Sequence, residues 1–349
     1  TQHTEDYSKE TFYFRQSMKE IFNPDKFILK GGKGTGKTYL YRAFRSERFK
    51  ERLLQKLNGT SANYKFVLAI PLEKDKILHI DNQIKLSAIA DPDFFFHRFW
   101  LIYIYLQLRP WLGELGIPDS IENFTLRNDG QAITKIKRII KDDANFVIVE
   151  NQLKDLDKAL NKEGKKISIL FDQLDVMVKP KNWDIAITPL LEIFRARPYT
   201  HIIPKIFIRT DLYNKLGNLT NKQELKSQIV SLEWSRNEIF AFFFKVILAH
   251  SKDALFKLLW AYLKDDARAQ SLIASIDKEN QIPLQENKIK PFVEVFFGKW
   301  ADIKGTPKYG DSYEWFYKNL QNADGTISLR PFIDLINNAI ERCLDQIKK

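Results

Sequence analysis

The chain has 349 residues, enough for two domains at roughly 150 residues each, and its 55 Lys and Arg against 44 Asp and Glu give a formal net charge of +11. The single cysteine, Cys343, excludes an internal disulfide, and no apolar stretch approaches the roughly 20 residues of a membrane span, so we expect a cytoplasmic protein with no membrane segment. The basic excess leaves a nucleic-acid partner open, but the lysines are scattered rather than gathered in blocks, which favours a lysine-rich surface.

The first part of the chain predicts a helix, a strand and a second helix. Residues 8–22 predict a short amphipathic entry helix that ends at Asn23-Pro24. Residues 26–29 form a short apolar run suited to a buried strand, and apolar residues recur at approximately helical spacing between positions 40 and 57.

A glycine-rich loop, GGKGTGKT at residues 31–38, separates this strand from the second helix and contains four of the chain's 14 glycines. It fits the pattern G-x-x-x-x-G-K-[ST], and in a strand, loop, helix unit such a loop holds phosphate oxygens with its N–H groups. Lys37 would then reach the β- and γ-phosphates, and the Thr38 hydroxyl would ligate Mg²⁺. The alternative is a glycine-rich turn that happens to precede a helix. The predicted nucleotide-binding residues are Gly31, Gly32, Lys33, Gly34, Thr35, Gly36, Lys37, Thr38 and Tyr39.

The following sequence alternates strands with helices, a pattern typical of a parallel sheet. Strands are predicted at 64–72, 167–171, 204–211 and 227–234, a polar loop at 73–92, a turn-rich stretch at 109–130, and helices at 94–108, 131–141, 146–163 and 185–197. From residue 235 onward the sequence is helical, with 238–250 and 254–263 the clearest segments. We therefore predict an α/β P-loop NTPase domain over residues 1–234, with a doubly wound sheet of about five parallel strands, and an all-helical lid or partner domain over 235–349.

An acid follows the predicted strand at 167–171, where a phosphate loop needs a carboxylate for Mg²⁺. Asp172 is the expected metal residue, although Asp is also favoured as the N-cap of a following helix. At the next position, where many such ATPases carry a catalytic Glu, this chain has Gln173, which can orient a water molecule but cannot accept its proton. Asp175 is the nearest carboxylate that could act as the base. Slow turnover and a binding switch both remain open.

Three arginines are candidates for contacts with the γ-phosphate. Arg209 ends the predicted strand at 204–211 and is the expected sensor, and its alternative role is an ion pair with Asp211. Arg195 and Arg197 could supply an arginine finger to a neighbouring subunit, or simply complement the dipole of a helix end.

Four motifs together resemble a bacterial P-loop ATPase family related to the STAND and AAA+ ATPases, of the class with an added strand. They are residues 31–38, ILFDQLD at 169–175, FIRTD at 207–211 and LEW at 232–234. The resemblance covers about residues 10–250, and residues 325–334 resemble a sensor-2 segment, which implies that Arg330 contacts the γ-phosphate. Gln173 departs from the family pattern, and no arginine finger can be assigned. The resemblance implies an ATP-driven switch, often in genome defence or signalling, with a helical lid that closes over the nucleotide.

Two functions are therefore expected. The first is an ATPase switch that uses Mg²⁺ and changes its lid or partner state when the γ-phosphate is lost, with Lys37, Asp172, Gln173, Asp175 and Arg209 at the reacting phosphate. The second is an ATP-bound scaffold with negligible hydrolysis that recruits a protein or nucleic-acid partner. The chain has no Asn-Lys-x-Asp guanine reader, which favours adenine. Self-association is compatible with both functions.

Overall fold

The computed structural model describes most of the chain. The described residues are 13–56, 63–80, 89–112, 137–138, 140–263, 270, 273–274, 276, 282, 284–302, 304–322 and 325–347. Its contacts divide the chain into two compact units. The α/β unit comprises Ser17–Gly31 and Lys37–Ser231, and the helical unit comprises Thr1–Gln16, Gly32–Gly36 and Leu232–Lys349.

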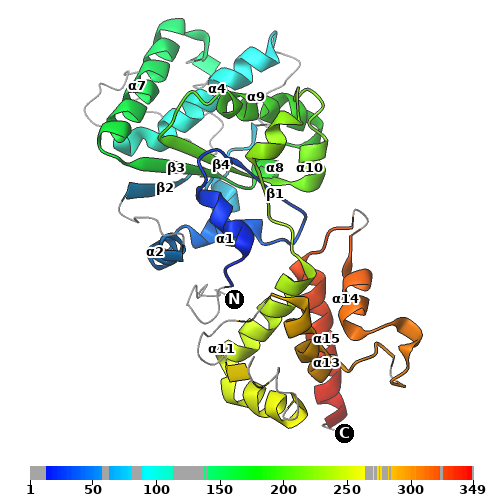
Figure 1. Ribbon diagram of the computed structural model, residues 1–349. Coiled ribbons are helices and arrows are strands. Elements are labelled where there is room, and N and C mark those ends of the chain that lie inside the picture. The colour runs from blue at the N-terminus through cyan, green and yellow to red at the C-terminus, as the bar shows by residue number, and fades with distance from the viewer. Residues whose placement is uncertain are drawn as a thin grey trace. The chain divides into compact units, whose positions relative to one another are not determined.

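The centre of the α/β unit is a five-stranded sheet in which every pair of neighbouring strands is parallel (Figure 1). Its strands are β1 (Ile28–Gly31), β2 (Tyr64–Leu68), β3 (Lys166–Phe171), β4 (Ile202–Arg209) and β5 (Ile229–Ser231). Their order is β2-β3-β4-β1-β5, so β4 lies between β1 and β3. β3 and β4 are buried along almost their whole length, as expected for central strands of a parallel sheet covered on both faces.

Helices cover both faces of this sheet: α4, α7 and α9 lie over one face, and α1 and α2 lie on the other (Figure 1). The α-helices are α1 (Lys37–Ala43), α2 (Glu47–Lys56), α4 (Pro92–Leu108), α7 (Asp143–Lys162), α8 (Leu174–Met177), α9 (Trp183–Arg195) and α10 (Thr210–Asn214). The 3-10 helices are η1 (Gln16–Phe22), η3 (Lys74–Lys76), η5 (Arg109–Trp111), η6 (Pro180–Asn182) and η7 (Glu224–Gln228). α4 starts where Asp91 accepts a hydrogen bond from the Phe94 N–H, and Pro92 occupies the first turn, both favourable features of a helix start. Because α4 is buried on nearly all sides, its apolar sequence forms the middle of the core.

The helical unit has a second, separate core. Its elements are α11 (Arg236–Leu263), α13 (Glu286–Phe297), η8 (Pro307–Tyr309), α14 (Ser312–Leu320) and α15 (Leu329–Ile347). Buried phenylalanines from different helices, among them Phe240, Phe244, Phe292 and Phe332, pack together there.

The α/β fold with five parallel strands is as predicted, whereas several boundaries differ. Residues 16–22 form a 3-10 helix rather than an α-helix, and residues 8–12 of the predicted entry helix lie outside the described part. β2 ends at Leu68, four residues before its predicted end. The predictions for 113–130 and most of 131–141 fall outside the described residues.

The predicted helices at 238–250 and 254–263 form one helix, α11, with non-helical backbone at Ser251. The contacts place the change from one unit to the other at Leu232, close to the predicted boundary after residue 234. They also assign residues 13–16 and Gly32–Gly36 to the helical unit, which the sequence did not predict. Among the described helices, none is both long enough and apolar enough to cross a membrane.

Candidate functional site

The carboxyl ends of β1, β3 and β4 bring three of the predicted site segments to one edge of the sheet. Gly31, the last residue of β1, is paired with Arg209, the last residue of β4. Phe171, the last residue of β3, is paired with Ile206 on β4, and Asp172 follows it directly. Ligands of open parallel α/β sheets bind outside this edge, so the fold places these residues where a site is expected.

Asp172 is a buried acid with an unused acceptor. Only 4% of the residue is exposed, and its Oδ2 atom is buried without a hydrogen-bond partner among the described residues. Burial raises the pKa of this carboxyl group, while the Thr38 hydroxyl, the backbone N–H of Gln173 and the charge of Lys37 oppose that rise. A buried carboxylate oxygen with no partner is costly, and a cation bound to it would remove that cost.

Thr38 and Lys37 reach this acid from the start of α1. Lys37 is only 9% exposed, and its ammonium group donates a 2.7 Å hydrogen bond to the carbonyl oxygen of Gly31. Tyr41, one turn along α1, is bonded to Ile70, just after β2. Its hydroxyl donates to Ile70 O at 2.5 Å and accepts from Ile70 N at 3.0 Å. Tyr41 thereby fixes the helix that carries the two candidate phosphate and metal residues.

The middle of the glycine-rich loop, Gly32–Gly36, is held by contacts inside the helical unit. Gly34 and Gly36 have φ of +86° and +91°, a region that side-chain-bearing residues rarely adopt. The Thr35 hydroxyl donates to Gly32 O at 3.0 Å, which closes the loop on itself. Lys33 at the loop tip is exposed, and so is Tyr39, just after the loop in α1.

Gln173 is in an unusual conformation for a residue with a side chain. Its φ of 57° and ψ of 27° place it in the left-handed region, immediately before α8. Its side-chain Nε2 atom is buried without a hydrogen-bond partner in the described part of the chain. Strained backbone at a non-glycine residue is a feature of functional sites, and here it coincides with an unused donor beside Asp172.

Arg209 has all three guanidinium nitrogens engaged by acids. Its Nε and Nη2 donate to the two carboxylate oxygens of Asp211 at 3.0 and 2.8 Å, and Nη1 lies 3.4 Å from Asp175 Oδ2. Burial tends to raise the pKa of Asp211, but the Arg209 hydrogen bond and charge outweigh it and hold this pKa below its ordinary value. The ion pair with Asp211, the alternative expected from the sequence, is therefore present, and γ-phosphate sensing by Arg209 stays a prediction.

The two other arginines are held by local contacts. Arg195 donates to the carbonyl oxygen of Thr220 at 2.9 Å, and Arg197 forms an ion pair of 2.8 Å with Asp25. Both groups are engaged within the α/β unit, and their use as a finger toward another subunit is untested.

Arg330 belongs to the helical unit, in the first turn of α15. A Cβ atom placed on Gly34 would lie 3.4 Å from the Cβ of Arg330 and 3.2 Å from the hydroxyl of Ser328. Gly34 therefore allows the start of α15 to approach the loop closely. Arg330 itself is exposed.

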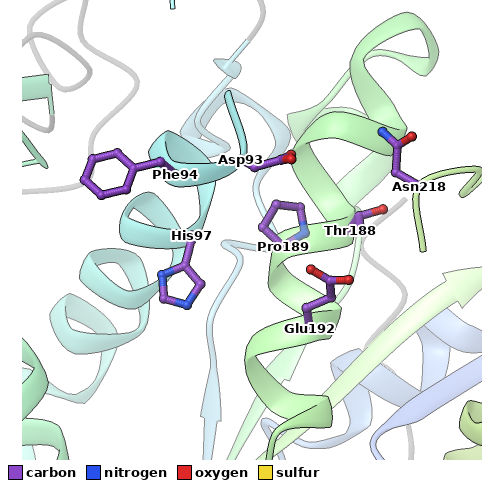
Figure 2. A pocket seen from close by; sticks show the side chains of 7 residues that line it. All are labelled: Asp93, Phe94, His97, Thr188, Pro189, Glu192 and Asn218. Carbon is purple, nitrogen blue, oxygen red and sulfur yellow. The ribbon is translucent and has the colours of Figure 1, made fainter. Parts of the chain in front are cut away.

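A cavity of about 340 Å³ lies elsewhere in the α/β unit, between α4 and α9. Figure 2 shows Asp93 and His97 of α4 beside Thr188, Pro189 and Glu192 of α9. Burial lowers the pKa of His97, although the charge of Glu150 opposes this. None of the residues that line the cavity has a buried side-chain polar atom without a hydrogen-bond partner. The cavity therefore lacks the feature that distinguishes Asp172.

The described residues contain no group of three or more His, Cys, Asp or Glu side chains that could hold a metal ion. This finding is compatible with Mg²⁺, which usually keeps several waters and takes only one or two carboxylates together with substrate phosphates. Comparison with known proteins finds no match to a family model, a curated protein or a solved structure.

Sequence reasoning did not identify Tyr41 or Glu233 as residues that position the candidate site. Glu233 Oε1 accepts a 2.7 Å hydrogen bond from the N–H of Gly32, 201 positions earlier in the chain. The only sequence feature that singled out Glu233 was its place in the LEW segment, and that segment does not indicate which residue Glu233 contacts. Tyr41 had no signal beyond its place on the helix that follows the loop.

Proposed function

We propose that this protein binds a magnesium–nucleoside triphosphate, with ATP as the favoured nucleotide, and hydrolyses it as a molecular switch. The observation that carries the proposal is the buried Asp172 carboxylate: one oxygen lacks a partner in the part of the chain that the structure describes, and the Thr38 hydroxyl at the end of the glycine-rich loop is hydrogen-bonded to the group. A hydroxyl and a carboxylate in contact are the protein ligands that a phosphate-bound Mg²⁺ uses in P-loop NTPases.

The side chains present fit this ion. Thr38 and Asp172 would hold Mg²⁺, which supplies positive charge to the β- and γ-phosphate oxygens when bound. The Lys37 ammonium now donates to a neutral carbonyl of its own loop, and a bond to a phosphate oxygen would be stronger because both partners are charged. Lys37 is therefore the residue expected to change partner when nucleotide binds.

The strand order supports the class that the sequence resembles. β4 lies between the loop-bearing β1 and the acid-bearing β3, which is the arrangement expected of P-loop ATPases with an added strand. Simpler kinases and GTPases place these two strands side by side. Arg330 and the rest of the helical unit would respond to the γ-phosphate as the lid or partner-binding part of the switch.

A second function is an ATP-bound scaffold with negligible hydrolysis. It is favoured by Gln173 and Asp175, the residues predicted to handle the attacking water. Gln173 has no basic atom, and Asp175 is already paired with Arg209, whose nearest nitrogen lies 3.4 Å from its carboxylate. In this alternative the Gln173 amide orients water or a γ-phosphate oxygen without promoting attack. Bound ATP would then recruit a protein or nucleic-acid partner, and a nucleic-acid complex would weaken steeply with added salt.

The decisive experiment measures MgATP binding and single-turnover phosphate release for the wild type and Lys37→Ala. Lys158→Ala is the control, since Lys158 is an exposed lysine of α7 paired with Asp155. The ATPase proposal expects the wild type and Lys158→Ala to bind and release phosphate, and Lys37→Ala to lose release by at least about 100-fold. Binding without release in excess Mg²⁺ supports the scaffold. If the wild type binds no nucleotide, both functions are wrong.

A further inference from the structure

Two adjacent residues after β5 form hydrogen bonds with the glycine-rich loop, one at the beginning of the loop and one near its end. Glu233 Oε1 accepts the N–H of Gly32 at 2.7 Å, and the indole Nε1 of Trp234 donates to the carbonyl oxygen of Thr35 at 3.0 Å. All four residues belong to the helical unit. A loop that must present several N–H groups to one anion needs its peptide planes fixed, and these bonds fix two of them.

The bond from Trp234 determines which way a phosphate-binding group points. The described part of the chain has no cis peptide bond, and in a trans peptide the C=O and the next residue's N–H point in opposite directions. With Thr35 O directed at the indole, the N–H of Gly36 is directed away from it. A phosphate accepts from an N–H and is repelled by a carbonyl oxygen, so this orientation leaves the N–H side of the peptide, which suits an anion, on the side away from the indole.

Trp234 is itself held firmly. The guanidinium of Arg15 lies 4.4 Å from the centre of its ring, and Tyr13 stacks on it with 6.2 Å between ring centroids. Arg15 is only 3% exposed, and burial lowers its pKa, while the charges of Glu238 and Glu233 oppose that change. Glu233 and Trp234 thus belong to a partly buried cluster that also contains Tyr13, Arg15 and Glu238.

We propose that Glu233 and Trp234 are positioning residues that orient the glycine-rich loop for the diphosphate portion of a nucleotide, and that Trp234 senses its occupancy. The inference rests on the proposed function and deepens it by adding residues that the sequence pattern did not place at the site. Both bonds lie within the helical unit and join its Gly32–Gly36 segment to the segment that starts at Leu232.

The test measures MgADP affinity by calorimetry, together with the tryptophan fluorescence change that MgADP causes. Trp234→Phe keeps an aromatic ring for Arg15 and Tyr13 but removes the indole N–H. Trp260→Phe is the matched control, because Trp260 is an exposed tryptophan of α11 in the same unit. We expect Trp234→Phe to bind MgADP about tenfold more weakly, as for loss of one hydrogen bond, and to lose the fluorescence change, while Trp260→Phe retains both.

Two further variants separate positioning from folding. Glu233→Ala removes the acceptor for the Gly32 N–H and should weaken binding, whereas Glu233→Gln keeps an oxygen acceptor and should restore most of the affinity. Thermal unfolding without nucleotide is recorded for every variant. If the wild type binds MgADP and a folded Trp234→Phe variant binds it equally well with the same fluorescence change, the positioning role is wrong and the proposed function stands. If the wild type does not bind MgADP, the proposed function fails first.

Discussion

Asp172 and Lys205 are both charged residues buried in the α/β unit, but only one of them has its hydrogen-bonding groups satisfied by the protein. Lys205, on β4, is 2% exposed, and its ammonium donates to the carbonyl oxygens of Asn23 and Lys26 in the turn before β1. Asp172, after β3, is 4% exposed, and one of its carboxylate oxygens has no partner within the described ranges of the chain. Burial alone therefore does not mark a binding site, and the two residues differ in whether a buried polar atom lacks a partner among the described residues.

Arg209 is the third member of this comparison. It lies at the same edge of the sheet as Asp172, but it is partly exposed and its nitrogens are already engaged by Asp211 and Asp175. A contact with a phosphate would require Arg209 to exchange at least one of these partners. Among the described residues, the three groups thus differ in their partners: Asp172 has one oxygen without a partner, Lys205 is bonded to carbonyl groups in the core, and Arg209 is paired with two acids.

The largest expected effect comes from removing the Asp172 carboxylate. We expect Asp172→Ala to lower Mg²⁺-dependent phosphate release by about 100- to 1,000-fold, the usual scale for losing one electrostatic group at a reacting centre. The same substitution removes an unsatisfied buried charge, so the nucleotide-free protein should become more stable. Phosphate release across a Mg²⁺ titration and thermal unfolding without nucleotide measure the two effects.

Asp155→Ala is the control, since Asp155 is an exposed acid of α7 that pairs with Lys158. It should change neither quantity appreciably, because exposed ion pairs contribute little. An Asp172→Ala variant that is less stable and still releases phosphate normally would show that Asp172 caps or supports α8 and binds no metal.

The next effect concerns Lys205, whose pKa burial lowers to about 7, with the charge of Asp25 opposing the change. The unfolded chain then binds more protons at this residue between about pH 7 and its ordinary pKa of about 10.5, so stability rises with pH in that window. The slope is at most about 1.4 kcal/mol per pH unit. Urea unfolding at pH 7, 8 and 9 should show this rise in the wild type and a smaller one in Lys205→Met. Equal slopes would mean that Lys205 stays charged in the fold.

The sequence predicted the sheet edge well because the signals there are local. The apolar run 167–171 followed by an acid is sufficient to place Asp172 at the end of a buried strand, and the loop motif places Lys37 and Thr38 at the start of a helix. Parallel strands then bring these ends together without any further information.

The remaining contacts were not predictable, because they join residues far apart in the chain. Lys205 follows a proline inside a buried strand, and only the carbonyl groups of a turn about 180 residues earlier explain why a lysine is tolerated there. Glu233 likewise meets Gly32 only after the chain has folded. Whether Arg209 would face a ligand or Asp211 was an open choice in the sequence, since both partners suit a guanidinium group.

The smallest expected effect tests that choice at Arg209. If Arg209 exchanges Asp211 for the γ-phosphate during turnover, Arg209→Ala should lower phosphate release about tenfold, the value of one charge-assisted hydrogen bond, and change MgADP affinity little, because ADP has no γ-phosphate. Arg236→Ala is a matched control: Arg236 is also a partly exposed arginine held by two acids, Glu286 and Glu314, but it lies in the helical unit. Both variants should lose only about 0–1 kcal/mol of stability from their ion pairs. Equal phosphate release by the wild type and both variants would assign Arg209 to its ion pairs alone, and Asp172 would then be the only strand-end residue of the comparison that meets the nucleotide's metal or phosphates.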